Sequence, residues 1–196
     1  MRPEPNRKLF GRTVVELVAK RKGLCFGFFK SSTSTEDGEV CMNAEDVLLL
    51  ANGCDPEKLR MVVTQAIASN VLVSVDSSSS VLGSWTLSMR YAWPDDKWRN
   101  NIHTDVYARV LGYEGGLVEG PGISDIVCAI DQTTGGASRM FRLSWKYLAP
   151  LYARTQVVLV ARGRSESRIR RYSVCEAPET FPSECRALLD VELETL

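Results

Sequence analysis

The side chain best suited to proton chemistry in this chain is His103, which is its only histidine. An imidazole gains and loses a proton near neutral pH because its ordinary pKa is about 6.5. Tyr107 and Tyr113 follow it closely, and we expect them in the core or in the wall of a pocket. The alternative for His103 is a structural bridge within a loop, and Asp105 is expected to cap the helix that follows it.

The cysteines do not form a metal-binding pattern. They are scattered without a Cys-x-x-Cys pair, and one histidine is too few for the common zinc sites. We therefore expect no metal and no cofactor, and reduced, mostly buried thiols in an intracellular compartment. The six cysteines are Cys25, Cys41, Cys54, Cys128, Cys175 and Cys185.

The charge balance argues against a nucleic-acid-binding protein. Lys plus Arg and Asp plus Glu number 24 each, whereas nucleic-acid-binding domains usually carry a basic excess. Hydrophobic residues make up 44% of the chain, which is enough for a packed core. No apolar stretch reaches the roughly 18 residues that a membrane-spanning helix needs.

The first thirty residues depart from this balance, with eight basic side chains against two acidic ones. Between them lies a set of apolar residues that could share one helical face. A basic amphipathic helix is typical of a mitochondrial targeting segment; the alternative is a first helix that packs on the domain or on a partner. The apolar set is Leu9, Phe10, Val14, Leu17 and Val18.

The rest of the first 80 residues predicts a mixed, mainly helical N-terminal extension. Residues 24–42 form either a hairpin or a loose excursion, and a short helix capped by Asn43 is expected to follow. Asp55 and Pro56 begin a second helix with an apolar face that reaches about residue 69. Residues 70–75 are β-branched and apolar and predict a strand, and serines 77–80 predict a linker.

From residue 81 onward the pattern predicts an antiparallel sheet with one central helix. Residues 85–91 alternate as a half-buried strand does, and 105–111 predict a short helix. A glycine-rich elbow at 115–122 precedes a helix with a wide apolar face. Strands are expected at 140–147, 156–162, 169–176 and 186–194. A curved sheet wrapped around the helix satisfies this order, which makes the fold class α+β.

Two stretches resemble the MaoC-like hydratases and dehydratases, a family with the hotdog fold. The first reads Asn-Asn-Ile-His-Thr-Asp at 100–105, Tyr-Ala at 107–108, Gly-Tyr at 112–113 and Val-Glu-Gly at 118–120. The second reads Tyr-Leu-Ala-Pro-Leu-Tyr at 147–152. The resemblance covers about 110 residues. It implies a single hotdog domain at 81–196 that holds an acyl thioester carried on CoA or on acyl carrier protein.

The resemblance also implies roles for individual residues. His103 matches the catalytic histidine, and Asn100 could orient it. Gly120 and Gly122 would let substrate approach the start of the central helix, where backbone N–H groups stabilise a developing oxyanion. Tyr107 and Tyr113 would line the substrate pocket.

Two positions depart from the family pattern. An aspartate is common five residues before the histidine, where this chain has Trp98, and the histidine of the Val-His-Gly run is Glu119 here. A buried carboxylate at Glu119 would be costly unless paired, so we expect it to face solvent or a partner. Arg168, Arg170 and Arg171 form a basic cluster, expected at a solvated edge, with a phosphate contact as the alternative.

The predicted function is that of a 3-hydroxyacyl-thioester dehydratase, a hydro-lyase, and its expected role is in mitochondrial fatty-acid synthesis. The alternative is an inactive hotdog subunit of a large mitochondrial assembly such as the mitoribosome, where RNA contact becomes possible. A thioesterase is a third option, because that chemistry also occurs on this fold. We expect a homodimer or a subunit of a larger complex, with no membrane partner, in mitochondria or otherwise in the cytoplasm.

Overall fold

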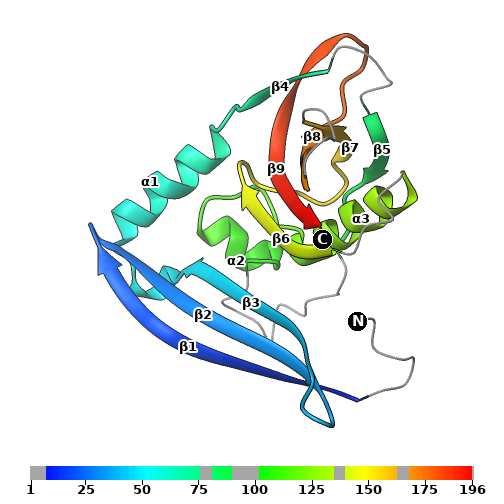
Figure 1. The fold of residues 1–196 in the computed structure, drawn as a ribbon. Coiled ribbons are helices and arrows are strands. Elements are labelled where there is room, and N and C mark those ends of the chain that lie inside the picture. The colour runs from blue at the N-terminus through cyan, green and yellow to red at the C-terminus, as the bar shows by residue number, and fades with distance from the viewer. Residues whose placement is uncertain (1–7, 76–80, 90–101, 135–139, 163–167, 196) are drawn as a thin grey trace. The chain divides into compact units, whose positions relative to one another are not determined.

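The computed structural model describes residues 8–75, 81–89, 102–134, 140–162 and 168–195. The chain divides into two compact units, Met1–Val62 and Val63–Leu196, and each unit contains its own sheet (Figure 1). The predicted linker at 77–80 lies outside the described residues. The predicted boundary after residue 80 therefore stays a prediction.

The first unit is built on a three-stranded antiparallel sheet in the order β1-β2-β3. Its first turn has two residues in the left-handed region, Lys22 at φ 51° and Gly23 at φ 82°. Two consecutive left-handed residues match the right-handed twist of a tight hairpin. The strands are β1 (Leu9–Arg21), β2 (Leu24–Thr35) and β3 (Val40–Leu49).

The prediction of a mainly helical N-terminal extension is wrong. The segment predicted as a basic amphipathic helix is β1, and the short helix predicted after Asn43 is part of β3. The first segment holds three valines, which pack better in strands than in helices, whereas residues 43–50 hold one. The mitochondrial targeting segment stays a prediction, and residues 9–21 do not have the helical form that motivated it.

The helix predicted to begin at Pro56 is present. After a short 3-10 turn, η1 (Ala51–Gly53), α1 runs over Pro56–Ile67. The Asp55 carboxylate accepts hydrogen bonds from the backbone N–H groups of Glu57 and Lys58, each at 3.0 Å. This is the predicted N-cap, since it satisfies amides that have no partner inside the helix.

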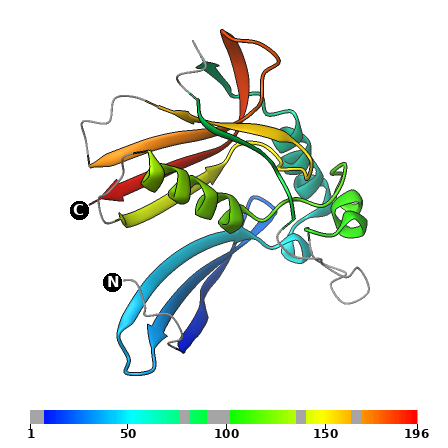
Figure 2. The same cartoon turned by 90° about the vertical axis from the view of Figure 1, so that its right-hand side faces the viewer.

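The second unit wraps a six-stranded antiparallel sheet around α3, as predicted from the order of its elements. The path through the sheet is β4-β9-β8-β7-β5, and β6 pairs with β9. Figure 2 shows α3 lying along one face of this curved sheet. The elements are β4 (Leu72–Val75), β5 (Val81–Thr86), α2 (Asp105–Val110), α3 (Gly120–Thr133), β6 (Met140–Tyr147), β7 (Gln156–Ala161), β8 (Ile169–Glu176) and β9 (Ser183–Thr195).

The main core lies between α3 and the sheet. Ile123 and Val127 of α3 are 2% and 0% exposed, and they belong to one cluster with Leu159, Val174 and Leu189 of the sheet. The apolar face predicted for this helix is therefore buried by strands that are distant in sequence. No helix in the described part of the chain is long and apolar enough to span a membrane.

One arginine of β9 closes the carboxyl end of α1. The Arg186 guanidinium donates to the carbonyl oxygen of Ile67 at 2.8 Å and to that of Ser69 at 2.9 Å, and it pairs with Glu176 at 3.3 Å. These carbonyls lie at the end of the helix, where a cation is favourable and backbone acceptors lack helical donors. Arg186 thereby joins the carboxyl end of α1, which belongs to the second unit, to the sheet of that unit.

We expect Arg186→Ala to lower the free energy of unfolding by about 2 kcal/mol, because it removes charge-assisted hydrogen bonds to partly buried acceptors. Urea denaturation of the full chain measures this loss. The matched control is Arg162→Ala, which breaks an ion pair with Asp190 on the exposed side of the same sheet. Its cost should stay below about 1 kcal/mol. Equal costs for the two variants would contradict the capping role.

Candidate functional site

The loop before α3 holds its shape through a short helix and one carboxylate. Thr104 caps α2, with its hydroxyl accepting a hydrogen bond from the N–H of Tyr107 at 3.4 Å. Asp105 was expected to be this cap, but its carboxylate instead accepts from the N–H of Gly116 at 2.7 Å. A side chain at Gly116 would collide with the backbone carbonyl of His103. The loop can therefore close only with a glycine there.

The His103 imidazole is held by a backbone carbonyl. Its Nδ1 lies 2.6 Å from the carbonyl oxygen of Leu117. A carbonyl oxygen can only accept, so Nδ1 carries the hydrogen of this bond and the lone pair of the neutral ring is on Nε2. The ring is half-buried. This arrangement gives the imidazole a fixed orientation and makes Nε2 its basic atom.

The segment around Leu117, which holds the imidazole, is itself bonded to the loop between β6 and β7. The N–H of Leu117 donates to Ile102 at 3.0 Å, and Leu117 also forms an isolated antiparallel bridge with Tyr152. The N–H of Val118 donates to the carbonyl of Leu151 at 2.7 Å. His103 is thus positioned by a strand-like contact between two loops rather than by a helix or a long strand.

Glu119 and Gly120 form the start of α3. Glu119 is the N-cap residue and is 8% exposed, so the expectation that it faces solvent is wrong. Gly120 is buried, and Gly122 is half-buried two residues into the helix. The first N–H groups of a helix have no intrahelical acceptor, and Pro121 contributes none. The oxyanion-stabilising role expected for Gly120 and Gly122 stays a prediction.

The other predicted site residues take different positions. Tyr107 lies on α2 and Tyr113 follows that helix, and both are half-buried. Burial raises the pKa of Tyr113, with a smaller contribution from nearby Tyr152. Asn100 lies outside the described residues, as does Trp98.

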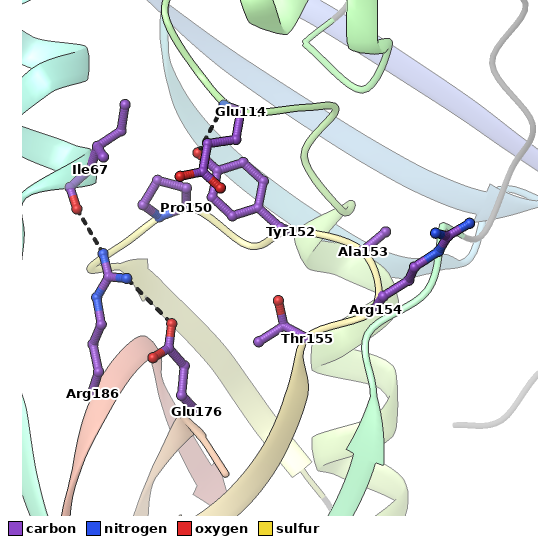
Figure 3. Close-up of a pocket in the computed structure, with 9 residues that line it drawn as sticks. All are labelled: Ile67, Glu114, Pro150, Tyr152, Ala153, Arg154, Thr155, Glu176 and Arg186. Carbon is purple, nitrogen blue, oxygen red and sulfur yellow. Dashed lines mark hydrogen bonds and ion pairs between the residues drawn. The ribbon is translucent and has the colours of Figure 1, made fainter. Parts of the chain in front are cut away.

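A polar pocket of about 400 Å³ opens beside this loop (Figure 3). The hydroxyl of Tyr152 accepts a hydrogen bond from the N–H of Glu114 at 3.3 Å on one side, and the Arg186–Glu176 pair lies on the other. Arg186 already binds the carbonyl oxygens at the end of α1. We therefore interpret this pocket as a junction between secondary-structure elements and not as a substrate site. His103 is not among its lining residues, which are Ile67, Glu114, Pro150, Tyr152, Ala153, Arg154, Thr155, Glu176 and Arg186.

A charged cluster lies near the opposite end of α3, and the sequence did not predict it. The Tyr172 hydroxyl donates a short hydrogen bond to the Asp131 carboxylate, and Arg170 approaches the same oxygen at 3.1 Å. The Asp131 and Arg170 side chains are only 7% and 13% exposed, so the expectation of a solvated edge is wrong for Arg170. Arg171 on the other face does pair near the surface, with Glu192 at 2.8 Å.

The cysteines are all unpaired with one another, but they differ in burial. Cys25, Cys175 and Cys185 are buried, Cys54 and Cys128 are intermediate, and Cys41 is exposed. Burial raises the pKa of the Cys175 thiol to about 12, so this thiol is not a nucleophile at neutral pH. No cluster of three or more His, Cys, Asp and Glu that could hold a metal occurs within the described ranges.

Solved structures with the hotdog fold resemble this chain. HtdX of Mycobacterium tuberculosis gives a TM-score of 0.58 at 10% identity, over 97% of this chain and 70% of that chain. A second M. tuberculosis protein, described as having a double hotdog fold, gives 0.53 at 11% identity over 96% and 69%. A MaoC-like dehydratase from Phytophthora capsici gives 0.52 at 11% identity over 96% and 62%.

These likenesses establish the fold. The structural neighbours are MaoC-like dehydratases and other hotdog proteins, so the predicted hotdog fold is confirmed. The chain spans 62–70% of the length of these three proteins. No protein-family model matches the sequence, and a search of curated proteins gives no significant match.

The cluster of Asp131, Arg170 and Tyr172 predicts how the free energy of unfolding changes at alkaline pH. Burial and the Asp131 carboxylate raise the pKa of Tyr172 above its ordinary value of about 10. The resulting stability is fully present below pH 10 and is lost as the pH rises, because the unfolded chain then ionises the phenol and the folded chain does not. Urea denaturation between pH 8 and about 11 should therefore show a falling free energy of unfolding.

We expect Tyr172→Phe to change this curve in two ways. Near pH 7 the variant should lose about 1–2 kcal/mol, since Asp131 loses a buried donor. Above pH 10 its free energy of unfolding should fall less steeply than that of the wild type. An unchanged slope above pH 10 would show that Tyr172 does not carry the alkaline response.

Proposed function

We propose that this protein binds an acyl thioester and interconverts 3-hydroxyacyl and 2-enoyl thioesters, with His103 as the general base. The observation that carries the proposal is the 2.6 Å hydrogen bond between Nδ1 of His103 and the carbonyl of Leu117. It presents Nε2 as a proton acceptor on the loop that leads into the central helix of a hotdog fold. The likeness in fold to HtdX and to a MaoC-like dehydratase supports the choice of fold, and the description of the second protein supports the choice of reaction class.

The proposed dehydration starts with removal of the C2 proton by Nε2 of His103. Negative charge then moves to the thioester oxygen, which needs hydrogen-bond donors in the transition state. The C3–O bond then breaks, and the leaving hydroxyl takes the proton from the His103 imidazolium, which gives water, the enoyl thioester and the neutral ring. The start of α3, which begins at Gly120, would lie beside the thioester in the role that the family resemblance predicts for Gly120 and Gly122. Asn100, in the predicted family role, would help to orient the imidazole.

The direct test is turnover of crotonyl-CoA and longer 2-enoyl-CoA esters by the purified full chain, followed as loss of enoyl-thioester absorbance. The same acyl groups on acyl carrier protein are assayed in parallel. His103→Ala should lower the rate by about 100-fold or more, because general base catalysis contributes at least that much. Added imidazole should restore part of the rate.

The matched control is Arg109→Ala, which changes an exposed side chain in the last turn of the neighbouring helix α2. It should retain wild-type rate and wild-type melting temperature. Absence of turnover with every chain length and both carriers would remove the proposal. Release of free thiol without hydration would instead identify a thioesterase.

A second candidate is a non-catalytic hotdog subunit of a larger assembly such as the mitoribosome. The observation that favours it is Glu119, a buried carboxylate at the position of a family histidine, together with Trp98 at the position of a family aspartate. In that case the chain would co-purify with a large particle at a stoichiometric ratio. A free homodimer with measurable turnover, as native mass spectrometry and kinetics would show, contradicts it.

A further inference from the structure

The sheet of the first unit has two outer strands, and both are accessible along most of their length. In the described part of the chain, β1 and β3 each pair only with β2, so the outer edge of each strand has no strand partner (Figure 1). Nearly all of β1 and most of β3 are exposed. A long unpaired edge presents backbone N–H and C=O groups to which another strand can add.

The outer strand β1 is basic. It carries Arg12, Lys20 and Arg21, and all three side chains are exposed. Its one acidic residue, Glu16, pairs with Lys30 of the central strand β2 at 2.8 Å. The acidic residue is therefore compensated inside the sheet, and the edge of β1 presents net positive charge.

The outer strand β3 is acidic. It contains Glu45 and Asp46 and no basic residue, and the turn at 36–39 before it adds three more carboxylates. Lys30 approaches Glu45 at 3.6 Å but is already bound to a carboxylate of β1. Charged side chains at sheet edges usually keep copies of a protein apart. That protection needs edges that repel each other, whereas the two edges of this sheet have opposite charge and attract.

The two edges also match in sequence when they run antiparallel. An alignment with Arg12 of one copy opposite Asp46 of the next places Phe10 opposite Leu48. The basic end of β1 then lies beside the acidic turn at 36–39. The β-bulge of β1 falls after residue 15, so the segment around Arg12 is a regular strand. Cross-strand pairs of opposite charge and of apolar side chains both favour such pairing.

We propose that the protein associates with itself through the first sheet, with β1 of one copy adding to β3 of a second copy. Pairing of two equal edges would bring basic against basic or acidic against acidic side chains. The interface is therefore heterologous, and it leaves one β1 edge and one β3 edge open in each pair of copies. A heterologous interface continues into a ring or a chain of copies. This proposal does not depend on the acyl-thioester function.

The first test measures the mass of the full chain by size-exclusion chromatography with light scattering over a range of protein concentrations. At low salt the mass should rise with concentration. In about 1 M NaCl the dissociation constant should rise by about tenfold or more, because salt screens exposed charges. A chain that stays monomeric at every concentration overturns the proposal. Association that salt strengthens also overturns it, since burial of apolar surface alone would behave in that way.

The second test reverses the charge of one edge at a time. Arg12→Glu combined with Lys20→Glu makes β1 acidic, and Glu45→Lys combined with Asp46→Lys makes β3 basic. Each double variant alone should associate at least about tenfold more weakly than the wild type, because its two edges then carry like charge. An equimolar mixture of the two should associate as the wild type does, since every edge meets one of opposite sign.

The matched control reverses two exposed basic residues on β6, which pairs only with β9 among the described strands, by Arg142→Glu combined with Lys146→Glu. It should associate like the wild type, and an equal loss in this control would overturn the proposal. A mixture of double variants that stays monomeric, although both keep the wild-type melting temperature, overturns it as well. If a double variant loses its melting transition, the single changes Arg12→Glu and Asp46→Lys replace it, with the same restoration expected in the mixture.

Discussion

Burial of one apolar face of α3 by the curved sheet is the constraint on which the second unit depends. Ile123 and Val127 are almost fully removed from water, and burial of each such side chain contributes about 2 kcal/mol. The packing fixes the axis of α3, so both of its ends have defined surroundings. The amino end meets the loop that carries His103, and the carboxyl end meets β8. His103 and the Asp131–Arg170 pair are therefore separated by the length of one helix.

The two ends have opposite electrostatic requirements. The amino end of a helix carries partial positive charge, which favours a developing oxyanion, and the carboxyl end carries partial negative charge. Asp131 lies in the last turn of α3, where a carboxylate is unfavourable unless a cation is near. Arg170 and the Tyr172 hydroxyl supply that compensation. The cluster is best understood as compensation for the buried Asp131 carboxylate in the last turn of α3, whose final residues are exposed.

The sequence predicted α1 and the second unit well because their signals are local. The apolar spacing of α3, the capping pattern before α1 and the alternation of the later strands each specify an element over a few residues. In the first unit, the same kind of local pattern led to a wrong prediction. Its apolar residues at 9, 10, 14, 17 and 18 fit a helical face, and the deciding turn at Lys22 and Gly23 shows its left-handed backbone only in three dimensions. Long-range pairs were not predictable either, since Asp131 and Arg170 meet only after the sheet has formed.

The sheet of the first unit has a physical consequence for how the protein must be handled. Val14 and Val15 of β1 are both exposed, as are Val47 and Leu48 of β3. Adjacent residues on a strand point to opposite faces, so each of the two faces displays apolar side chains to water. Such surfaces are normally covered by another element or another molecule, and they promote clustering when they are not. Detergent, low protein concentration or co-expression with a covering chain is therefore the appropriate starting point for any preparation that includes residues 9–49.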